Sequence, residues 1–519
     1  MFAIPSRADI IAVAAQYGFH VDDDSVAEWQ AFLAARLETL DRFVQERTDG
    51  DRPPLLFPER GPGHRPSAAE DPSNAWLWKC AIGGKDTGLL AGRTVSFKDH
   101  VAVAGIPITF NAFALNGLIS DIDATVVTRI LDAGATVIGK NTMFGLSGGR
   151  SLGGYVGDYW EAINPHDPER TTGGSSSGSA VAVATGEVDI AIAGDQGGSI
   201  RLPAAYCGIV GLKPTFGLVP HMGATFGSEP SIDHLGPMAR TIEDVAAALQ
   251  AIAGHDDYDP RQGWEVPASV DALSGLGDGV RGLRIGLLEE GFEDPIDAEV
   301  RDGVLAALDA LSAAGAVVTR VSVPEHRSVH LAAGTLAVEG AWAIRTLGPF
   351  GAGARNYYPE TITAAVNRMW ATEGDLISTH TKANVLLTEF SRRNFHGATY
   401  AKAQNLRAGF VRAYDRALAD VDILALPTSA TVAPLLPERV SHREGLAREL
   451  EDLRGGYADT VRHTRPFSYT GHPALAVPCG KVGGLPISLQ LVGRRFEDPV
   501  LLRAGYALQQ AIGREPEPR

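Results

Sequence analysis

The chain has 519 residues, of which 45% are apolar and 21% are charged, an ordinary balance for a soluble globular protein that excludes disordered and fibrous classes. The 46 basic and 62 acidic residues give a net charge of −16, which argues against a general nucleic-acid binder because such a protein needs a basic face. No apolar run in the sequence approaches the ~20 residues that a membrane-spanning helix requires.

The N-terminus carries only a short apolar stretch, residues 10–15, with acidic residues on either side. A secretory signal peptide has a longer apolar core and a basic start, so we predict none here. The three cysteines, Cys80, Cys207 and Cys479, are far apart and odd in number, which indicates neither a disulfide framework nor a metal site. The sequence therefore predicts a protein of the reducing cytoplasm.

Residues 1–50 are predicted to be helical. Ser25 and Glu28 have the spacing of a capping box. Apolar residues recur behind them at helical spacing, namely Val26, Trp29, Phe32, Leu33, Leu37, Leu40 and Phe43. Such a stripe needs a partner, either the main body or a second subunit. Prolines then crowd residues 53–72 at a density that helices and strands reject, so we predict an N-terminal helical extension and Pro-rich linker at residues 1–70.

From residue 71 onward, short β-branched runs alternate with helical stretches. Strands are predicted at residues 94–97, 136–140, 188–193, 283–288, 316–323, 421–426, 475–477 and 487–492, and helices at 124–131, 298–311, 408–419 and 500–510. This alternation predicts an α/β fold. Residues 325–405 break it, because they are mostly helical and rich in aromatic residues. We expect them to form a smaller helical lobe inserted into a main domain of residues 71–519.

A Gly/Ser run at residues 171–180 is the first segment with candidate chemistry. Such a run is either a flexible linker or a backbone that comes close to a ligand, with N–H groups presented at a helix start. The unbroken apolar stretch that follows it, residues 180–184, favours the second interpretation.

Two further segments carry residues suited to catalysis. Residues 194–201 read GDQGGSIR after a predicted strand, and their glycines permit a tight turn whose amide protons face one point, as an oxyanion hole requires. Ser199 ends that turn, either as a nucleophile or as a capping serine. Lys98 ends another predicted strand. It is either a solvated lysine or a buried base whose pKa, ordinarily about 10.4, has been lowered.

Together these segments resemble the amidase signature family. The resemblance centres on residues 173–220, with GDQGGSIRLPAAYCG at 194–208 and GLKPTFG at 211–217, and extends over roughly residues 75–510, to TGHPAL at 470–475 and GLP at 484–486. The N-terminal helices and residues 232–237 look most like bacterial amidases associated with nitrile hydratases. The implied fold is a large mixed, twisted β-sheet covered by helices on both faces, with an N-terminal helical extension and a helical insertion.

The resemblance implies a Ser–cis-Ser–Lys triad, in which Ser199 matches the nucleophile, Ser175 the bridging serine on a cis peptide, and Lys98 the base. Neutral Lys98 would draw a proton through Ser175 from Ser199, which attacks an amide carbonyl and forms an acyl-enzyme. The implied oxyanion hole consists of backbone N–H groups, those of Gln196, Gly197, Gly198 and Ser199. The resemblance implies neither a metal nor a cofactor.

Four neighbours of the triad have their own interpretations. Ser176 and Asp195 match family motif positions and are predicted to support the triad by hydrogen bonds. Arg201 is either part of a structural ion pair beneath the turn or a substrate contact. His100 stands where several relatives carry Asn. If charged, it would disfavour the charged form of Lys98.

Two other motifs indicate different kinds of active site. The sequence GSSSG at 174–178 fits the G-x-S-x-G nucleophile elbow of α/β-hydrolases, with Ser176 as nucleophile and His472 as the triad histidine, but no clear strand precedes it. His326 and His330 have the spacing of a zinc-binding helix, but Arg327 stands where H-E-x-x-H has Glu.

The sequence therefore predicts an amidase that hydrolyses a carboxamide to a carboxylic acid and ammonia or an amine. Three alternatives stay open: a hydrolase of the same mechanism acting on carbamates, hydrazides or anilides, the A subunit of a glutamine-dependent amidotransferase, and a non-catalytic scaffold with this fold. Candidate pocket residues for an aryl or alkyl acyl group, the aromatic ones equally readable as core, are Phe144, Gly148, Gly149, Phe467 and Tyr469. We expect a homodimer through the N-terminal helices, without nucleic-acid or membrane partners.

Overall fold

The computed structural model describes residues 2–46, 52–147, 161–224, 229–347, 357–436, 441–454 and 460–513. The chain divides into two compact units, Met1–Pro53 and Pro54–Arg519. This division does not test the predicted extension of residues 1–70 or the predicted lobe at about 325–405, which stay predictions.

The described part of the first unit contains two α-helices, α1 (Arg7–Gln16) and α2 (Val26–Gln45). A capping box starts α1, where Ser6 and Asp9 exchange hydrogen bonds. The capping box predicted at Ser25 is absent, because residues 23–25 form a short 3-10 turn and the Ser25 hydroxyl donates to the carbonyl of Asp22. The small buried core of the first unit consists of Ile10, Ala14, Val21 and Val26.

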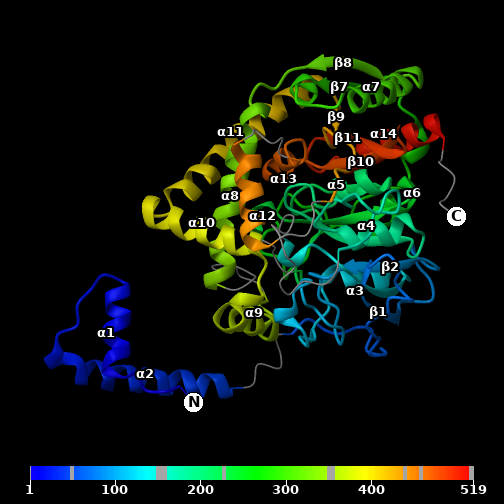
Figure 1. Ribbon diagram of the computed structural model, residues 1–519. Helices are drawn as coiled ribbons and strands as arrows, with labels where there is room; N and C mark the ends of the chain where they lie inside the picture. Colours follow the sequence, from blue (N-terminus) through cyan, green and yellow to red (C-terminus); the bar gives the residue numbers. More distant parts are fainter. Residues whose placement is uncertain are drawn as a thin grey trace. The chain divides into compact units, whose positions relative to one another are not determined.

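The second unit is built on an eleven-stranded sheet. The strands are β1 (Trp76–Gly83), β2 (Thr94–Lys98), β3 (Thr136–Asn141), β4 (Ile190–Asp195), β5 (Val210–Lys213), β6 (His234–Ala239), β7 (Arg284–Leu288), β8 (Val317–Val321), β9 (Ile423–Pro427), β10 (Ala474–Val482) and β11 (Leu485–Gly493). Their order is β1-β3-β2-β4-β6-β5-β10-β11-β9-β7-β8 (Figure 1). β2 runs parallel to β3 and β4, and β7 to β8 and β9, whereas the other pairs are antiparallel. The predicted α/β fold with a large mixed sheet is confirmed.

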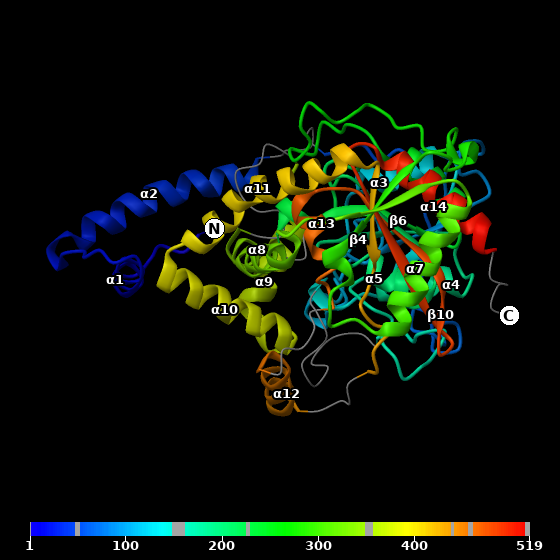
Figure 2. The same cartoon turned by 90° about the horizontal axis from the view of Figure 1, so that it is seen from above.

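Helices pack on both faces of this sheet. In the described part of the second unit, the α-helices are α3 (Thr125–Asp132), α4 (Ser177–Ala184), α5 (Arg201–Cys207), α6 (Ile242–Ile252), α7 (Ala298–Ala313), α8 (His326–Leu347), α9 (Glu360–Thr372), α10 (Thr379–Phe395), α11 (Ala398–Asp420), α12 (His442–Arg454), α13 (Arg465–Thr470) and α14 (Asp498–Ile512). Of these, α3, α6, α7 and α14 pack on one face of the sheet and α4 and α5 on the other. Figure 2 shows α8, α10 and α11 grouped beside the strands. Within the described ranges, no helix is both long and apolar enough to cross a membrane.

The side chains of β4 show how the two faces are filled. Ile190 and Ile192 belong to the core that includes α3, α6, α7 and α14, whereas Ala191 and Ala193 belong to the core that includes α4 and α5. Every residue of β4, α4 and α5 is buried. Because β2 and β4 are parallel neighbours, their carboxyl ends bring Lys98 and Asp195 to the same edge of the sheet.

Candidate active site

Lys98 ends β2 and lies wholly buried against the Gly/Ser run. Its Nζ lies 2.7 Å from Oγ of Ser175 and 3.5 Å from the carbonyl oxygen of Gly194, within hydrogen-bond reach of both. The peptide between Gly174 and Ser175 is cis. The Gly/Ser run is therefore an ordered, buried segment and not a linker, and it brings together two of the three predicted triad residues.

Close packing explains the glycines of this run. Gly173 has φ +73° and lies against the ring of Tyr206, and a Cβ at Gly174 would fall 2.1 Å from the ring of Phe144. Ser176, which precedes α4, donates its hydroxyl to the carbonyl of Gly194 at 3.3 Å. Ser176 and Lys98 thus contact the same carbonyl group at the end of β4.

Ser199 lies half-buried in the turn between β4 and α5. The turn folds around the carboxylate of Asp195, which accepts from the backbone N–H of Gly198 at 2.8 Å and from that of Ile200 at 3.1 Å. The N–H of Gly198 is therefore engaged by Asp195, which leaves Gln196, Gly197 and Ser199 of the predicted oxyanion donors. Among the described residues, no hydrogen bond joins the Ser199 hydroxyl to Ser175 or to any other group.

Arg201 holds the Asp195 carboxylate from the other side. Its guanidinium is fully buried and donates to both carboxylate oxygens, at 2.9 and 3.0 Å, as well as to Ser468 and Gln490 at 2.8 Å each. Burial alone would raise the pKa of Asp195, but Arg201 holds that pKa well below its usual range. Arg201 is thus the structural ion pair beneath the turn, because a fully buried guanidinium with these partners cannot reach a substrate.

The charge of Lys98 follows from its surroundings. Burial lowers the pKa of Lys98 to about 7, although the carboxylates of Asp233 and Asp195 oppose the shift. At neutral pH a large share of Lys98 is therefore the free amine, the form that can accept a proton.

His100 packs against Gly194, where a Cβ would lie 2.5 Å from its Nε2. Burial, reinforced by the charge of Lys98, lowers the pKa of His100 well below the ordinary value. His100 is therefore neutral at neutral pH, and the predicted effect of a charged histidine on Lys98 does not apply there.

The predicted pocket residues separate into three groups. Phe144 lies at the triad, since its ring covers Gly174 and its N–H donates to the carbonyl of Ser175 at 3.0 Å. Phe467 and Tyr469 are core residues: Phe467 is fully buried beside Tyr414, and the Tyr469 hydroxyl donates to a backbone carbonyl of α11. Gly148 and Gly149 lie outside the described residues.

The competing motifs have structural roles. His472 is buried between the hydroxyl of Thr470, at 2.9 Å, and the carboxylate of Asp415, at 3.1 Å. His326 lies 2.7 Å from the hydroxyl of Tyr414, and no group of three metal-binding side chains occurs in the part of the chain that the structure describes. The described residues directly before Ser176 form no strand, so the nucleophile-elbow interpretation is wrong.

Three buried side chains at this site, Thr464, Asp233 and His221, are not among the predicted site residues. Thr464 donates to the carbonyl of Gly197 at 2.6 Å and so fixes one peptide of the turn. Asp233 and His221 approach each other at 3.1 Å, both almost fully buried. Asp233 lies in residues 232–237, which carry part of the resemblance but were given no role, and no motif marks Thr464 or His221.

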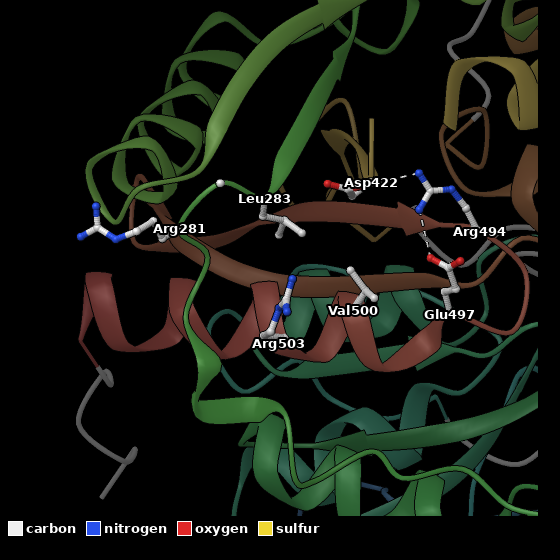
Figure 3. A pocket seen from close by; sticks show the side chains of 8 residues that line it. Arg281, Leu283, Asp422, Arg494, Glu497, Val500 and Arg503 are labelled. Atoms are coloured by element: carbon white, nitrogen blue, oxygen red, sulfur yellow. Dashed lines mark hydrogen bonds and ion pairs between the residues drawn. The ribbon is translucent and has the colours of Figure 1, made fainter. Parts of the chain in front are cut away.

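A polar cavity of about 280 Å³ lies elsewhere on the sheet (Figure 3). Its lining residues are Arg281, Gly282, Leu283, Asp422, Arg494, Glu497, Val500 and Arg503. Arg494 pairs there with Glu497 at 3.1 Å and with Asp422 at 3.4 Å. Because β6, β5, β10 and β11 separate β9 from β4, this cavity is not at the triad, and we do not place the substrate in it.

The fold and the site define a hydrolase that acts on amide C–N bonds, since a buried lysine of lowered pKa contacts a serine beside a glycine turn with a second serine. The profile of the Amidase family matches residues 67–502. The chain belongs to the amidase signature family.

Relatives and solved structures agree with this assignment. The chain is 35% identical over 526 residues to an enantioselective amidase of Rhodococcus rhodochrous, with 99% of this chain and 97% of that protein covered. It is 37% identical over 433 residues to the A subunit of the glutamyl-tRNA(Gln) amidotransferase of Carboxydothermus hydrogenoformans, with 82% and 84% covered. A peptide amidase in complex with chymostatin superposes with a TM-score of 0.66 at 29% identity, with 83% of this chain and 86% of that chain covered. The amidotransferase A subunit of Thermotoga maritima does so with a TM-score of 0.67 at 28% identity, with 85% and 88% covered.

Proposed function

We propose that this protein is a stand-alone amidase that converts a carboxamide to a carboxylic acid and ammonia or an amine, with Lys98, Ser175 and Ser199 as its triad. The observation that carries the proposal is the 2.7 Å contact between Lys98 and Ser175, formed by a lysine whose pKa burial lowers to about 7. Such a lysine is a competent base at neutral pH, whereas an ordinary lysine is not.

The reaction begins when the free amine of Lys98 takes the proton of the Ser175 hydroxyl while Ser175 takes that of Ser199. The Ser199 oxygen attacks the amide carbon and forms a tetrahedral intermediate. Ser175 then delivers a proton to the leaving nitrogen, since an amide nitrogen leaves poorly unless it is protonated. Water, activated through the same relay, attacks the acyl-enzyme, releases the acid and restores Ser199.

The oxyanion would rest on backbone N–H groups of the turn. Gln196, Gly197 and Ser199 are the donors we propose, because Asp195 engages the N–H of Gly198. The bond from Thr464 to the Gly197 carbonyl helps to fix this part of the turn. In comparable enzymes one such donor contributes about 3–4 kcal/mol to transition-state stabilisation.

A stand-alone enzyme fits better than a subunit of an amidotransferase. The match to the Rhodococcus amidase covers 99% of this chain, whereas the match to the amidotransferase A subunit covers 82%. For the substrate we propose a carboxamide with an aryl or alkyl acyl group, because the ring of Phe144 lies beside Ser175. An origin of that amide in nitrile hydration stays a prediction.

We also propose a homodimer formed through the N-terminal helices. Apolar side chains of α2 are exposed in the single chain, with Trp29 at 44%, Phe32 at 58% and Phe43 at 62%. The cytoplasm remains the proposed location, and the free thiols of Cys80, Cys207 and Cys479 suit a reducing compartment.

The test is hydrolysis of a panel of amides, anilides, carbamates and hydrazides by the purified protein. Ser199→Ala should abolish turnover, whereas Ser177→Ala, a substitution in the same Gly/Ser run, should retain it. Turnover of carbamates or hydrazides alone would keep the triad but replace the substrate. No turnover of any compound, or turnover that persists in Ser199→Ala, would overturn the proposed function.

A further inference from the structure

Asp233 reaches the site through the pairing of two strands. β6 runs antiparallel to β4, with Asp195 opposite His234. The same register continued by one residue places Asp233, just before β6, opposite Gln196, just after β4. Asp233 is 2% exposed, so its carboxylate is buried next to the turn that carries Ser199.

Several groups fix this carboxylate in place. The ring of His221 lies 3.1 Å from it, and the side chain of Gln196 forms a hydrogen bond with it. Arg261 donates to the main-chain carbonyl of Asp233 at 3.0 Å and also pairs with Asp259. The position of Asp233 is thus set by three side chains, those of His221, Gln196 and Arg261.

Asp233 and Asp195 are the two carboxylates whose charges raise the pKa of Lys98 and so oppose the effect of burial. Their situations differ, because Asp195 already forms a two-point ion pair with the guanidinium of Arg201. The close basic partner of Asp233 is His221, whose pKa burial lowers. Burial raises the pKa of Asp233, but His221 and Gln196 lower that pKa by a larger amount, so Asp233 stays ionised. The charge of Asp233 is therefore less neutralised by a neighbouring cation than that of Asp195, which Arg201 pairs at both oxygens.

We propose that Asp233 is a positioning residue of the amidase reaction, whose carboxylate stabilises the ammonium that Lys98 becomes on taking the proton and at the same time holds Gln196 in the oxyanion turn. This inference rests on the proposed function. The role parallels that of the aspartate in a Ser-His-Asp triad, which stabilises the protonated base without taking the proton itself.

The substitution Asp233→Asn separates charge from structure, because asparagine keeps the size and an acceptor for Gln196. The charged and titratable groups around the two residues are Asp195, His100, His221, Lys140, Arg261 and Asp259. Without the Asp233 charge, the ammonium form of Lys98 is less stable. We expect the acidic limb of the pH profile to move down by about one pH unit, and the plateau rate to fall about tenfold because the base is weaker.

The experiment follows sulfonylation of Ser199 by phenylmethanesulfonyl fluoride as a function of pH. In this step the Ser199 oxygen bonds to sulfur, fluoride leaves, and the proton passes through Ser175 to Lys98, so the rate reports the base without any choice of amide. Asp259→Asn is the matched control. Asp259 is a buried carboxylate that pairs with Arg261 and is not among the groups that shift the pKa of Lys98. The acidic limb of the pH profile of Asp259→Asn should therefore coincide with that of the wild type.

We expect the acidic limb to move to lower pH in Asp233→Asn. It should stay in place in Asp233→Glu, which restores the charge. An unmoved limb in Asp233→Asn would overturn the inference, and so would equal shifts in Asp233→Asn and Asp259→Asn. If Asp233→Asn does not fold, a moved limb in Asp233→Glu would also overturn it. Failure of the reagent to label Ser199 in the wild type, or labelling that persists in Ser199→Ala, would instead count against the proposed function.

Discussion

Replacing Lys98 by methionine should inactivate the enzyme and yet stabilise its fold. The lysine is fully buried, and its pKa falls from an ordinary value near 10.5 to about 7. That difference corresponds to about 5 kcal/mol of lost stability, at about 1.4 kcal/mol for each pKa unit. Loss of the contact with Ser175 offsets about 1–2 kcal/mol of the gain. We expect Lys98→Met to raise the free energy of unfolding at pH 7 by about 3 kcal/mol.

The pH dependence gives this prediction its sign. Below about pH 7, Lys98 is charged in both the folded and the unfolded chain, and the full cost of burying the charge applies. As the pH rises from about 7 toward about 10.5, the unfolded chain binds more protons than the folded one, so this cost disappears. The stability difference between Lys98→Met and the wild type should therefore shrink with rising pH.

The measurement is urea unfolding of both proteins at about pH 7 and about pH 9.5, followed by circular dichroism. Lys140→Met is the contrasting variant: Lys140 is equally buried but pairs with Asp99 at 3.1 Å, so its loss should destabilise the fold by about 3–5 kcal/mol. If Lys98→Met were less stable than the wild type at pH 7, or if the difference grew with pH, the assignment of a neutral buried lysine would be refuted.

Two further predictions concern Arg201 and the N-terminal helices. Arg201→Met should lower the free energy of unfolding by about 3–5 kcal/mol and abolish activity, because it leaves Asp195 buried without its counter-charge; an unfolding temperature equal to that of the wild type would contradict this. The double variant Phe32→Glu/Phe43→Glu should shift the molar mass in light scattering from dimer to monomer with activity retained, since both side chains are exposed on α2; a mass that stays dimeric would place the interface elsewhere.

The sequence predicted what local pattern controls. Strands such as β3 and β8 contain β-branched runs, and the motifs around Ser175 and Ser199 are continuous in the chain. β6 was missed because Gly236 and Pro237 interrupt its pattern and argue against a strand. In the fold it is nevertheless a fully buried strand between β4 and β5, an arrangement that only tertiary pairing reveals.

The candidate site, like β6, was only partly predictable from local sequence. The triad residues lie in motifs, but the groups that hold them come from distant parts of the chain. Ser468 is 267 residues from Arg201, and Gln490 is 289 residues away. Phe467 and Tyr469 were predicted as pocket residues because aromatic side chains suit both a pocket and a core, and burial alone distinguishes the two.

The place of the last two strands has a consequence for how the molecule is assembled. β10 and β11 come near the end of the chain but lie in the middle of the sheet, between β5 and β9. During synthesis, the strands from β1 to β6 and those from β7 to β9 emerge as two separate groups, each with an open edge, until residues 474–493 link them. A ribosome that stalls before this hairpin would release a chain with two edges open to aggregation, and without Gln490 beneath the Ser199 turn. Completion of the active site is therefore one of the last events in the production of this enzyme.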